Sequence, residues 1–188
     1  MAGGQRRSAR HTYPAAVLRL LAVAAAVLSL AACGSPATQN SADVAFAQGM
    51  VPHHEQALEM TELVASRTEN PHVIDLASRI SRSQKPEIDR MNGWLRSWNA
   101  PVQASSHSSH GHSDSRGMVE LGNLADLDGT EFDRQWLSLM IQHHRGAVEM
   151  AHKYLAAGTD PETRKLAQDV VAHQEKEISE MESLLPQG

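Results

Sequence analysis

The sequence predicts an all-α protein, a four-helix bundle built from a duplicated helical hairpin. Two observations carry this prediction: an eleven-residue motif that occurs twice, and helical spacing of apolar residues on either side of it. The motif reads M-x-x-H-H-x-x-A-x-E-M and covers residues 50–60 and, ninety positions later, residues 140–150. A short loop inside each half makes neighbouring antiparallel helices, and two hairpins stacked on their apolar faces form a bundle.

The repeat extends well beyond the motif, at the same offset and without gaps. The matched pairs include Asp43 and Asp133, Phe46 and Trp136, Pro71 and Pro161, Gln84 and Gln174, Met91 and Met181, and Leu95 and Leu185. Because the match covers most of two segments rather than one motif, it indicates duplication of a whole hairpin.

Start and stop signals set the expected helix boundaries. Ser41 is the expected N-cap of the first helix, and Thr130 that of the third. Asn70 and Asp160 each precede a proline, which is typical of the first helical position. We therefore expect hairpin one over residues 42–98, a linker over 99–127 that is rich in histidine, and hairpin two over 128–185, within a domain of residues 42–188.

The first 32 residues have the pattern of a lipoprotein signal peptide. Basic residues come first, an apolar run follows over 20–32, and the run ends Leu30-Ala31-Ala32-Cys33. The run is shorter than the ~20 residues that span a bilayer. We expect cleavage before Cys33, lipidation of Cys33, a polar tether over 33–41, and export to the bacterial envelope on a lipid anchor. An uncleaved apolar anchor is the alternative.

Charge and cysteine content exclude some classes of function. Removing the first 32 residues takes four of 17 basic residues and none of the 22 acidic ones, so the net charge falls from −5 to −9. Such a surface does not suit nucleic acid. Cys33 is the only cysteine, so we expect neither an intrachain disulfide nor a thiolate metal site.

The repeated motif gathers metal-ligating side chains on one helix face. At ~100° per residue, His53, His54, Met50 and Met60 share a face with the small Ala57 between them. The second copy repeats this geometry with His143, His144, Met140 and Met150. Imidazole and thioether are ligands for soft or borderline metals, above all copper, and thioether favours Cu(I) over Cu(II). Another transition metal is possible with the same donors.

Each candidate ligand also has a plainer interpretation. Methionine at helical spacing, including the pair Met91 and Met181, is often adaptable core filler. A histidine at a core edge is often a hydrogen-bonded structural residue. Four histidines at matched places would bring four half-polar rings toward one core, where they need partners, and a metal would supply them.

The partner helices carry further candidates. His173, Glu177 and Met181 are spaced four apart, whereas the matching residues are Ser83, Glu87 and Met91, so a site is not expected to be fully symmetric. Glu87 and Glu177 are interpreted as ligands, as acceptors that orient histidine rings, or as carboxylates facing water. Two further groups have weaker claims: Asp43 and Asp133, better explained as helix-start charges, and the linker residues His107, His110 and His112, which bind metal loosely or not at all.

The doubled motif, the later Gln-x-x-Glu-Ile-x-x-Met run and the duplication resemble the family called domain of unknown function 305, over Asp43 to Leu185. The resemblance implies a ferritin-like four-helix bundle, often exported and in some members associated with copper. It implies a site formed by the four motif histidines and the paired methionines, and it supplies no reaction.

Three functions compete on this evidence. The first is an envelope protein that binds copper for sequestration or transfer. The second is a ferritin-like redox enzyme, but only residues 149–152 match the Glu-x-x-His pattern of di-iron bundles, and Glu149 lies on the outer face. The third is a metal-free bundle that binds an envelope protein of unknown identity. Catalysis is not the favoured interpretation, since no nucleophile motif or phosphate loop is evident.

Overall fold

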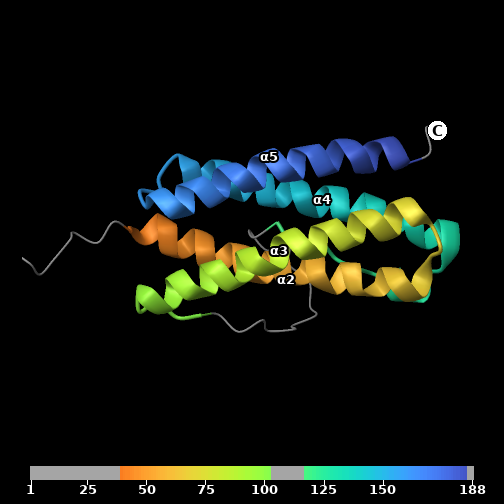
Figure 1. Cartoon of the computed structure of the whole chain (residues 1–188), viewed down its shortest axis with the longest axis horizontal. Helices are drawn as coiled ribbons and strands as arrows, with labels where there is room; N and C mark the ends of the chain where they lie inside the picture. Colours follow the sequence, from red (N-terminus) through yellow and green to blue (C-terminus); the bar gives the residue numbers. More distant parts are fainter. Residues whose placement is uncertain (1–38, 103–116, 186–188) are drawn as a thin grey trace, which may run out of the picture. The chain divides into compact units, whose positions relative to one another are not determined.

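A computed structural model describes residues 39–102 and 117–185 as an all-α fold (Figure 1). Four long helices account for most of it: α2 (Ser41–Arg67), α3 (Pro71–Ser97), α4 (Gly129–Leu155) and α5 (Pro161–Leu184). A short 3-10 helix, η2 (Leu124–Asp126), precedes α4. The described ranges contain no strand, so the predicted fold class is confirmed.

Helix starts follow the sequence signals closely, with two corrections. Proline after Asn70 and after Asp160 begins α3 and α5 as predicted, and both caps accept backbone N–H groups. The cap of α2 is Asn40 rather than Ser41: its side chain accepts from the backbone of Ala42 and Asp43, which completes a capping box. Helix α4 begins at Gly129, one residue before the predicted cap Thr130.

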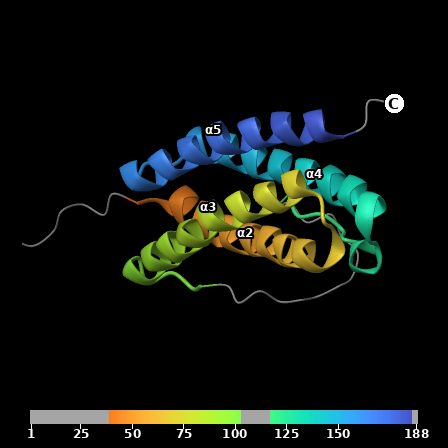
Figure 2. The same ribbon diagram turned by 45° about the vertical axis from the view of Figure 1, so that its right-hand side comes forward.

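The helices pair as two hairpins that meet through their first helices. Helix α2 packs along α3, α4 packs along α5, and α2 and α4 pack against each other (Figures 1 and 2). The motif-bearing helices therefore form the contact between the two halves of the duplication. Across the described segments, no helix combines the length and the apolar character that crossing a membrane requires.

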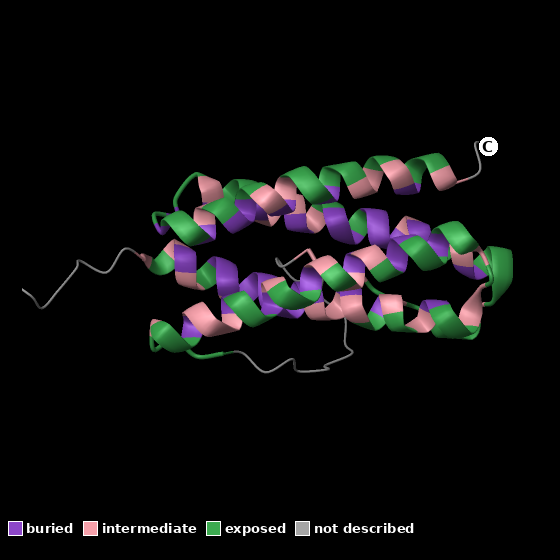
Figure 3. Ribbon diagram, in the orientation of Figure 1, coloured by how far each residue is buried: buried purple, intermediate pink, exposed green. Residues whose placement is uncertain are grey.

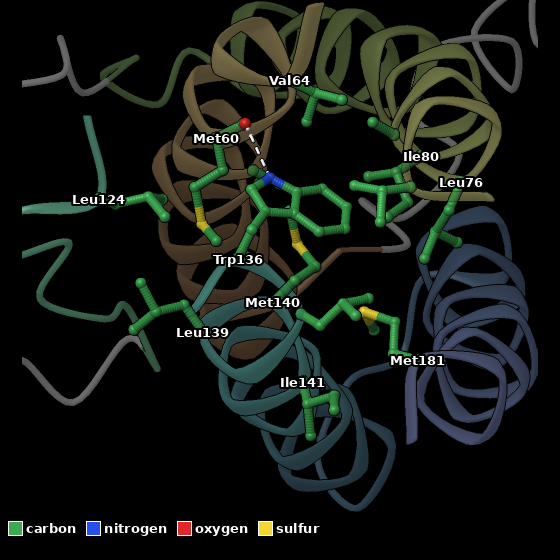
Figure 4. Packing of buried hydrophobic residues seen from close by; sticks show 14 of the residues in the cluster. Met60, Val64, Leu76, Ile80, Leu124, Trp136, Leu139, Met140, Ile141 and Met181 are labelled. Atoms are coloured by element: carbon green, nitrogen blue, oxygen red, sulfur yellow. Dashed lines mark hydrogen bonds between the residues drawn. The ribbon is translucent and has the colours of Figure 1, made fainter. Parts of the chain in front are cut away.

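Buried residues lie on the facing sides of the helices (Figure 3). The hydrophobic ones form two clusters. One, here called the Trp136 cluster, is shown in part in Figure 4, where the Trp136 indole donates to the Met60 carbonyl at 2.9 Å. Its buried members include Met60, Val64, Leu76, Ile80, Leu124, Phe132, Trp136, Met140 and Met181. The other, the Phe46 cluster, includes Phe46, Met50, Val51, Met91, Leu95, Tyr154, Leu166 and Val170.

A buried carboxylate ties the start of α2 to the loop between α4 and α5. Asp43 accepts a hydrogen bond from the Tyr154 hydroxyl at 2.6 Å and from the backbone N–H groups of Thr159 and Asp160 at 3.1 Å. Burial alone would raise the pKa of Asp43, but these bonds and that from Asn40 lower it below its usual value. Its repeat partner Asp133 instead accepts from the Asn70 side chain, so the two aspartates do more than favour helix starts.

The signal peptide, Cys33 and the linker histidines lie outside the described residues. The predicted cleavage point, tether and domain limits therefore stay predictions.

Candidate metal site

The two histidine pairs lie at the centre of the contact between α2 and α4. Along α2, the buried residues of the Phe46 cluster end at Val51 and those of the Trp136 cluster begin at Ala57, with His53 and His54 between them. Helix α4 passes through the same clusters in the opposite order, again with its histidine pair between them. All four rings are 0% exposed. The prediction that the motif faces the core is correct, and the core is divided by a layer of imidazoles.

The outer ring of each pair is held by a carboxylate of its own hairpin. Nε2 of His54 lies 2.8 Å from the Glu87 carboxylate, and Nε2 of His144 lies 2.8 Å from that of Glu177. A carboxylate accepts, so Nε2 of each ring carries the hydrogen. Of the roles considered for these glutamates, the geometry matches that of acceptors that orient histidine rings.

The inner rings are held by backbone carbonyls. His143 donates from Nε2 to the His53 carbonyl at 3.0 Å, and His53 donates from Nε2 to the Gly117 carbonyl at 3.2 Å. The two inner rings lie close together, with centroids 3.7 Å apart and planes tilted by 34°. Since a carbonyl can only accept, Nε2 is protonated in both rings.

Burial keeps the inner rings neutral. Desolvation, with a smaller contribution from His54 and His144, lowers the pKa of His53 to about 3. Desolvation likewise lowers the pKa of His143 well below its ordinary value, with the other three rings adding to the effect. A neutral ring with hydrogen on Nε2 has a lone pair on Nδ1.

The Nδ1 atoms are the outstanding feature of the site. All four are buried and have no hydrogen-bond partner. Buried polar atoms in folded proteins normally have partners, and each exception requires an explanation. Four imidazoles, each held through Nε2 and each with an unpartnered Nδ1, are the arrangement that a set of metal-ligating histidines requires.

Methionines flank this layer on both sides. Met60, Met140 and Met181 belong to the Trp136 cluster, and Figure 4 shows their sulfur atoms within it. Met50 and Met91 belong to the Phe46 cluster, and Met150 is partly buried against it. Each side thus has three of the six predicted thioethers, supplied by both halves of the chain.

The donor set fits a soft metal better than a hard one. Within residues 39–102 and 117–185, no group of three or more His, Cys, Asp or Glu side chains forms a metal-binding cluster. A metal in this layer would therefore need donors of another kind, and the methionine sulfurs of the two flanking clusters are the candidates. Imidazole nitrogen with thioether suits copper, whereas Mg²⁺ and Ca²⁺ require oxygen-rich shells.

One predicted residue is not brought to the layer. His173 is exposed on α5, because each four-residue step turns a helix by ~40° beyond a full turn. Going back from the buried Met181, Glu177 is already 12% exposed and His173 faces solvent.

Two glutamines that the sequence analysis did not single out as candidates are buried instead. A step of seven residues returns almost to the same helix face, so Gln174 is the buried residue on α5, and Gln84 is its equivalent on α3. Both have buried side-chain amide atoms without a partner. Each lies seven residues before a buried methionine, Met91 or Met181, and this spacing in the sequence could have identified them.

Comparisons with known proteins agree with this fold. The model of the family described as domain of unknown function (DUF305) matches residues 43–185. A solved DUF305 fragment from Deinococcus radiodurans is 32% identical with a TM-score of 0.70, covering 79% of this chain and 97% of that one. CopM in its Cu(II)-bound form is 34% identical with a TM-score of 0.68, covering 76% and 94%.

Other matches are CopM in Cu(I)-bound and Ag-bound forms, at 34% and 33% identity. The uncharacterized protein L153 of Acanthamoeba polyphaga mimivirus is 40% identical over 53 residues, a stretch that spans only 35% of that protein. With a family match over most of its length and these structural neighbours, the chain belongs to the DUF305 family.

Proposed function

We propose that this protein binds copper in the histidine layer between α2 and α4 and serves to sequester the metal or pass it on. The observation that carries the proposal is the set of four buried, unpartnered Nδ1 atoms. The chain holds each ring through its Nε2 atom: Glu87 and Glu177 fix the outer rings, and backbone carbonyls fix the inner rings. Flanking methionine sulfur supplies the remaining donors.

Similarity to CopM supports the choice of metal. That protein has been solved in Cu(I)-, Cu(II)- and Ag-bound forms, and its fold covers most of this chain. We infer a preference for Cu(I), because six buried or half-buried thioethers flank neutral imidazoles and neither donor brings a negative charge. Ag(I), which has similar chemistry, should bind in the same way.

We place the protein outside the cytoplasmic membrane, held by lipid on Cys33. The support is in the sequence: an apolar run ending Leu30-Ala31-Ala32-Cys33, followed by a short polar stretch before α2 begins. A cell-envelope location suits a protein that intercepts copper before it reaches the cytoplasm.

The test is a Cu(I) titration against a competing chelator, using the purified domain. The double variant His143→Ala with His144→Ala should lose more than about 100-fold in affinity, since loss of supporting groups alone costs 10–100-fold. The matched control is His152→Ala with His173→Ala, two exposed histidines from α4 and α5, which should bind as the wild type does. Circular dichroism recorded in parallel establishes that both variants keep their helices.

Unchanged affinity in the first variant, with the fold intact, would refute the site. A loss in the control variant would instead return His173 to the ligand set.

A further inference from the structure

The segment just before η2 has no counterpart in the duplication, yet it contacts the histidine layer. We propose that Gly117 to Val119, here called the strap, is a positioning element of the metal site that holds His53 ready to bind. This inference rests on the proposed copper function. Three contacts carry it, one to each of His53, Gln56 and Gly146.

The first contact breaks the symmetry of the two halves. His143 donates from Nε2 to the backbone carbonyl of His53, its counterpart on the other helix. Exact repetition would have His53 donate to the carbonyl of His143. It donates instead to the carbonyl of Gly117 at 3.2 Å, so a carbonyl of the strap, and not one of α4, is the acceptor for this ring.

The second contact fixes the strap to α2. The side-chain amide of Gln56 donates to the Val119 carbonyl at 2.9 Å and accepts from the Val119 backbone N–H at 3.0 Å. This is the pattern of a β-ladder, with a side chain replacing one strand. Gln56 lies two residues after His54, and its two bonds hold the strap across the histidine layer.

The third contact is on α4, at the position equivalent to Gln56. Gly146 packs so closely on the strap that a β-carbon there would lie 2.5 Å from the Gly117 carbonyl oxygen. That oxygen is the one to which His53 donates. Gly117 itself has φ of +69°, and a β-carbon on it would lie 2.7 Å from the Gly146 α-carbon. Equivalent residues of the two halves thus seat the strap by different means, Gln56 by hydrogen bonding and Gly146 by leaving room.

The consequence for the site follows from imidazole chemistry. The Gly117 carbonyl accepts from Nε2 of His53, which fixes the hydrogen on that atom and leaves the lone pair on Nδ1. Without the strap, His53 would lose the bond that sets its tautomer and ring orientation. Partners that orient a ligand in this way typically change metal affinity 10–100-fold.

The experiment compares two helical glycines. Gly146→Ala drives a β-carbon into the strap, whereas Gly93→Ala, in α3, meets nothing within 4 Å and raises helix propensity to the same extent. In metal-free protein, nitrogen-15 NMR of the histidine rings reports the tautomer of His53 and the exchange rate of its Nε2 hydrogen. We expect Gly146→Ala to mix the tautomers and speed this exchange, and to lower Cu(I) affinity 10–100-fold. Gly93→Ala should match the wild type in both measurements.

Gln56→Ala is the second variant, since it releases the strap without adding bulk, and Gln142→Ala on the exposed side of α4 is its control. Gln56→Ala should reproduce the changes in the His53 ring, and Gln142→Ala should not. A wild-type His53 signal and affinity in both strap variants would overturn the proposal. The ring signals are recorded without metal, so they test the strap independently of copper binding. A wild type that binds no copper would refute the proposed function but would leave this test of the strap intact.

Discussion

Acid should destabilise the metal-free protein more steeply than an ordinary helical bundle, because neutral imidazoles are buried at its centre. Burial lowers the pKa of His53 to about 3, while a histidine in an unfolded chain titrates near ~6.5. The unfolded state therefore takes up the proton first as the pH falls. The contribution of this ring to stability is complete above pH ~6.5 and is lost progressively as the pH falls from ~6.5 toward about 3.

The expected magnitude is large for one side chain. With these two pKa values, going from pH ~7 to ~4 lowers the free energy of unfolding by ~3 kcal/mol, with a slope of ~1.4 kcal/mol per pH unit at pH ~5. A domain of this size is stable by ~5–15 kcal/mol, so His53 alone removes a fifth or more of the total. The pKa of His143 is lowered for the same reason, which adds to the loss in the same direction.

The assay is urea unfolding followed by circular dichroism at several pH values, for the wild type and His53→Gln. Glutamine cannot be protonated, and its amide can still donate to the Gly117 carbonyl. The difference between the two proteins isolates His53 from the carboxylates, which titrate in both. His152→Gln, at an exposed site on α4, is the control for loss of an imidazole already in contact with solvent. Equal pH slopes for wild type and His53→Gln would refute the reasoning.

Four further outcomes are expected. Met140→Leu, nearly equal in volume, should weaken Cu(I) binding more than Cu(II) binding in chelator competition, and equal losses would contradict a thioether ligand. Tyr154→Phe should lower the urea unfolding free energy by ~1.5–3 kcal/mol, since it removes a buried hydrogen bond to the Asp43 carboxylate; no loss would show that bond to be dispensable. Cys33→Ala should block processing and membrane fractionation, and normal anchoring of this variant would rule out the lipobox. Deletion of residues 105–115 should leave helicity and melting temperature nearly unchanged, and a large loss would place this segment in the fold.

Much of the fold could be predicted because its signals are local. Proline after Asn70 and after Asp160 marks the start of a helix wherever it occurs, and both helices begin there. The choice between neighbouring caps is less local. Asn40, not Ser41, has the extended backbone that lets its side chain reach the first turn, and the residue names alone do not reveal which backbone will be extended.

The candidate site could be predicted as a face but not as a set of atoms. Helical spacing correctly placed the motif histidines inside, because burial follows directly from the period of the helix. Extending the buried stripe of α5 in steps of four residues also included His173, which the structure leaves exposed because each such step turns further from the core. The role of Gly117 could not be predicted at all. It acts through its backbone carbonyl, and its segment lacks the repeat that revealed the other contacts.

The pattern of contacts explains why the arrangement of the four histidines requires both hairpins to pack together in one bundle. Each outer ring is held through Nε2 within its own hairpin, by Glu87 or Glu177. Each inner ring needs something from outside it: His143 needs the backbone of α2, and His53 needs the strap. Both methionine groups likewise combine residues of the two halves. Half of the molecule could orient one imidazole, but neutral buried rings between two sets of thioethers arise only where α2 and α4 pack together. The proposed metal site and the interface between the hairpins are therefore the same structure, and copper bound there would stabilise the folded bundle by mass action.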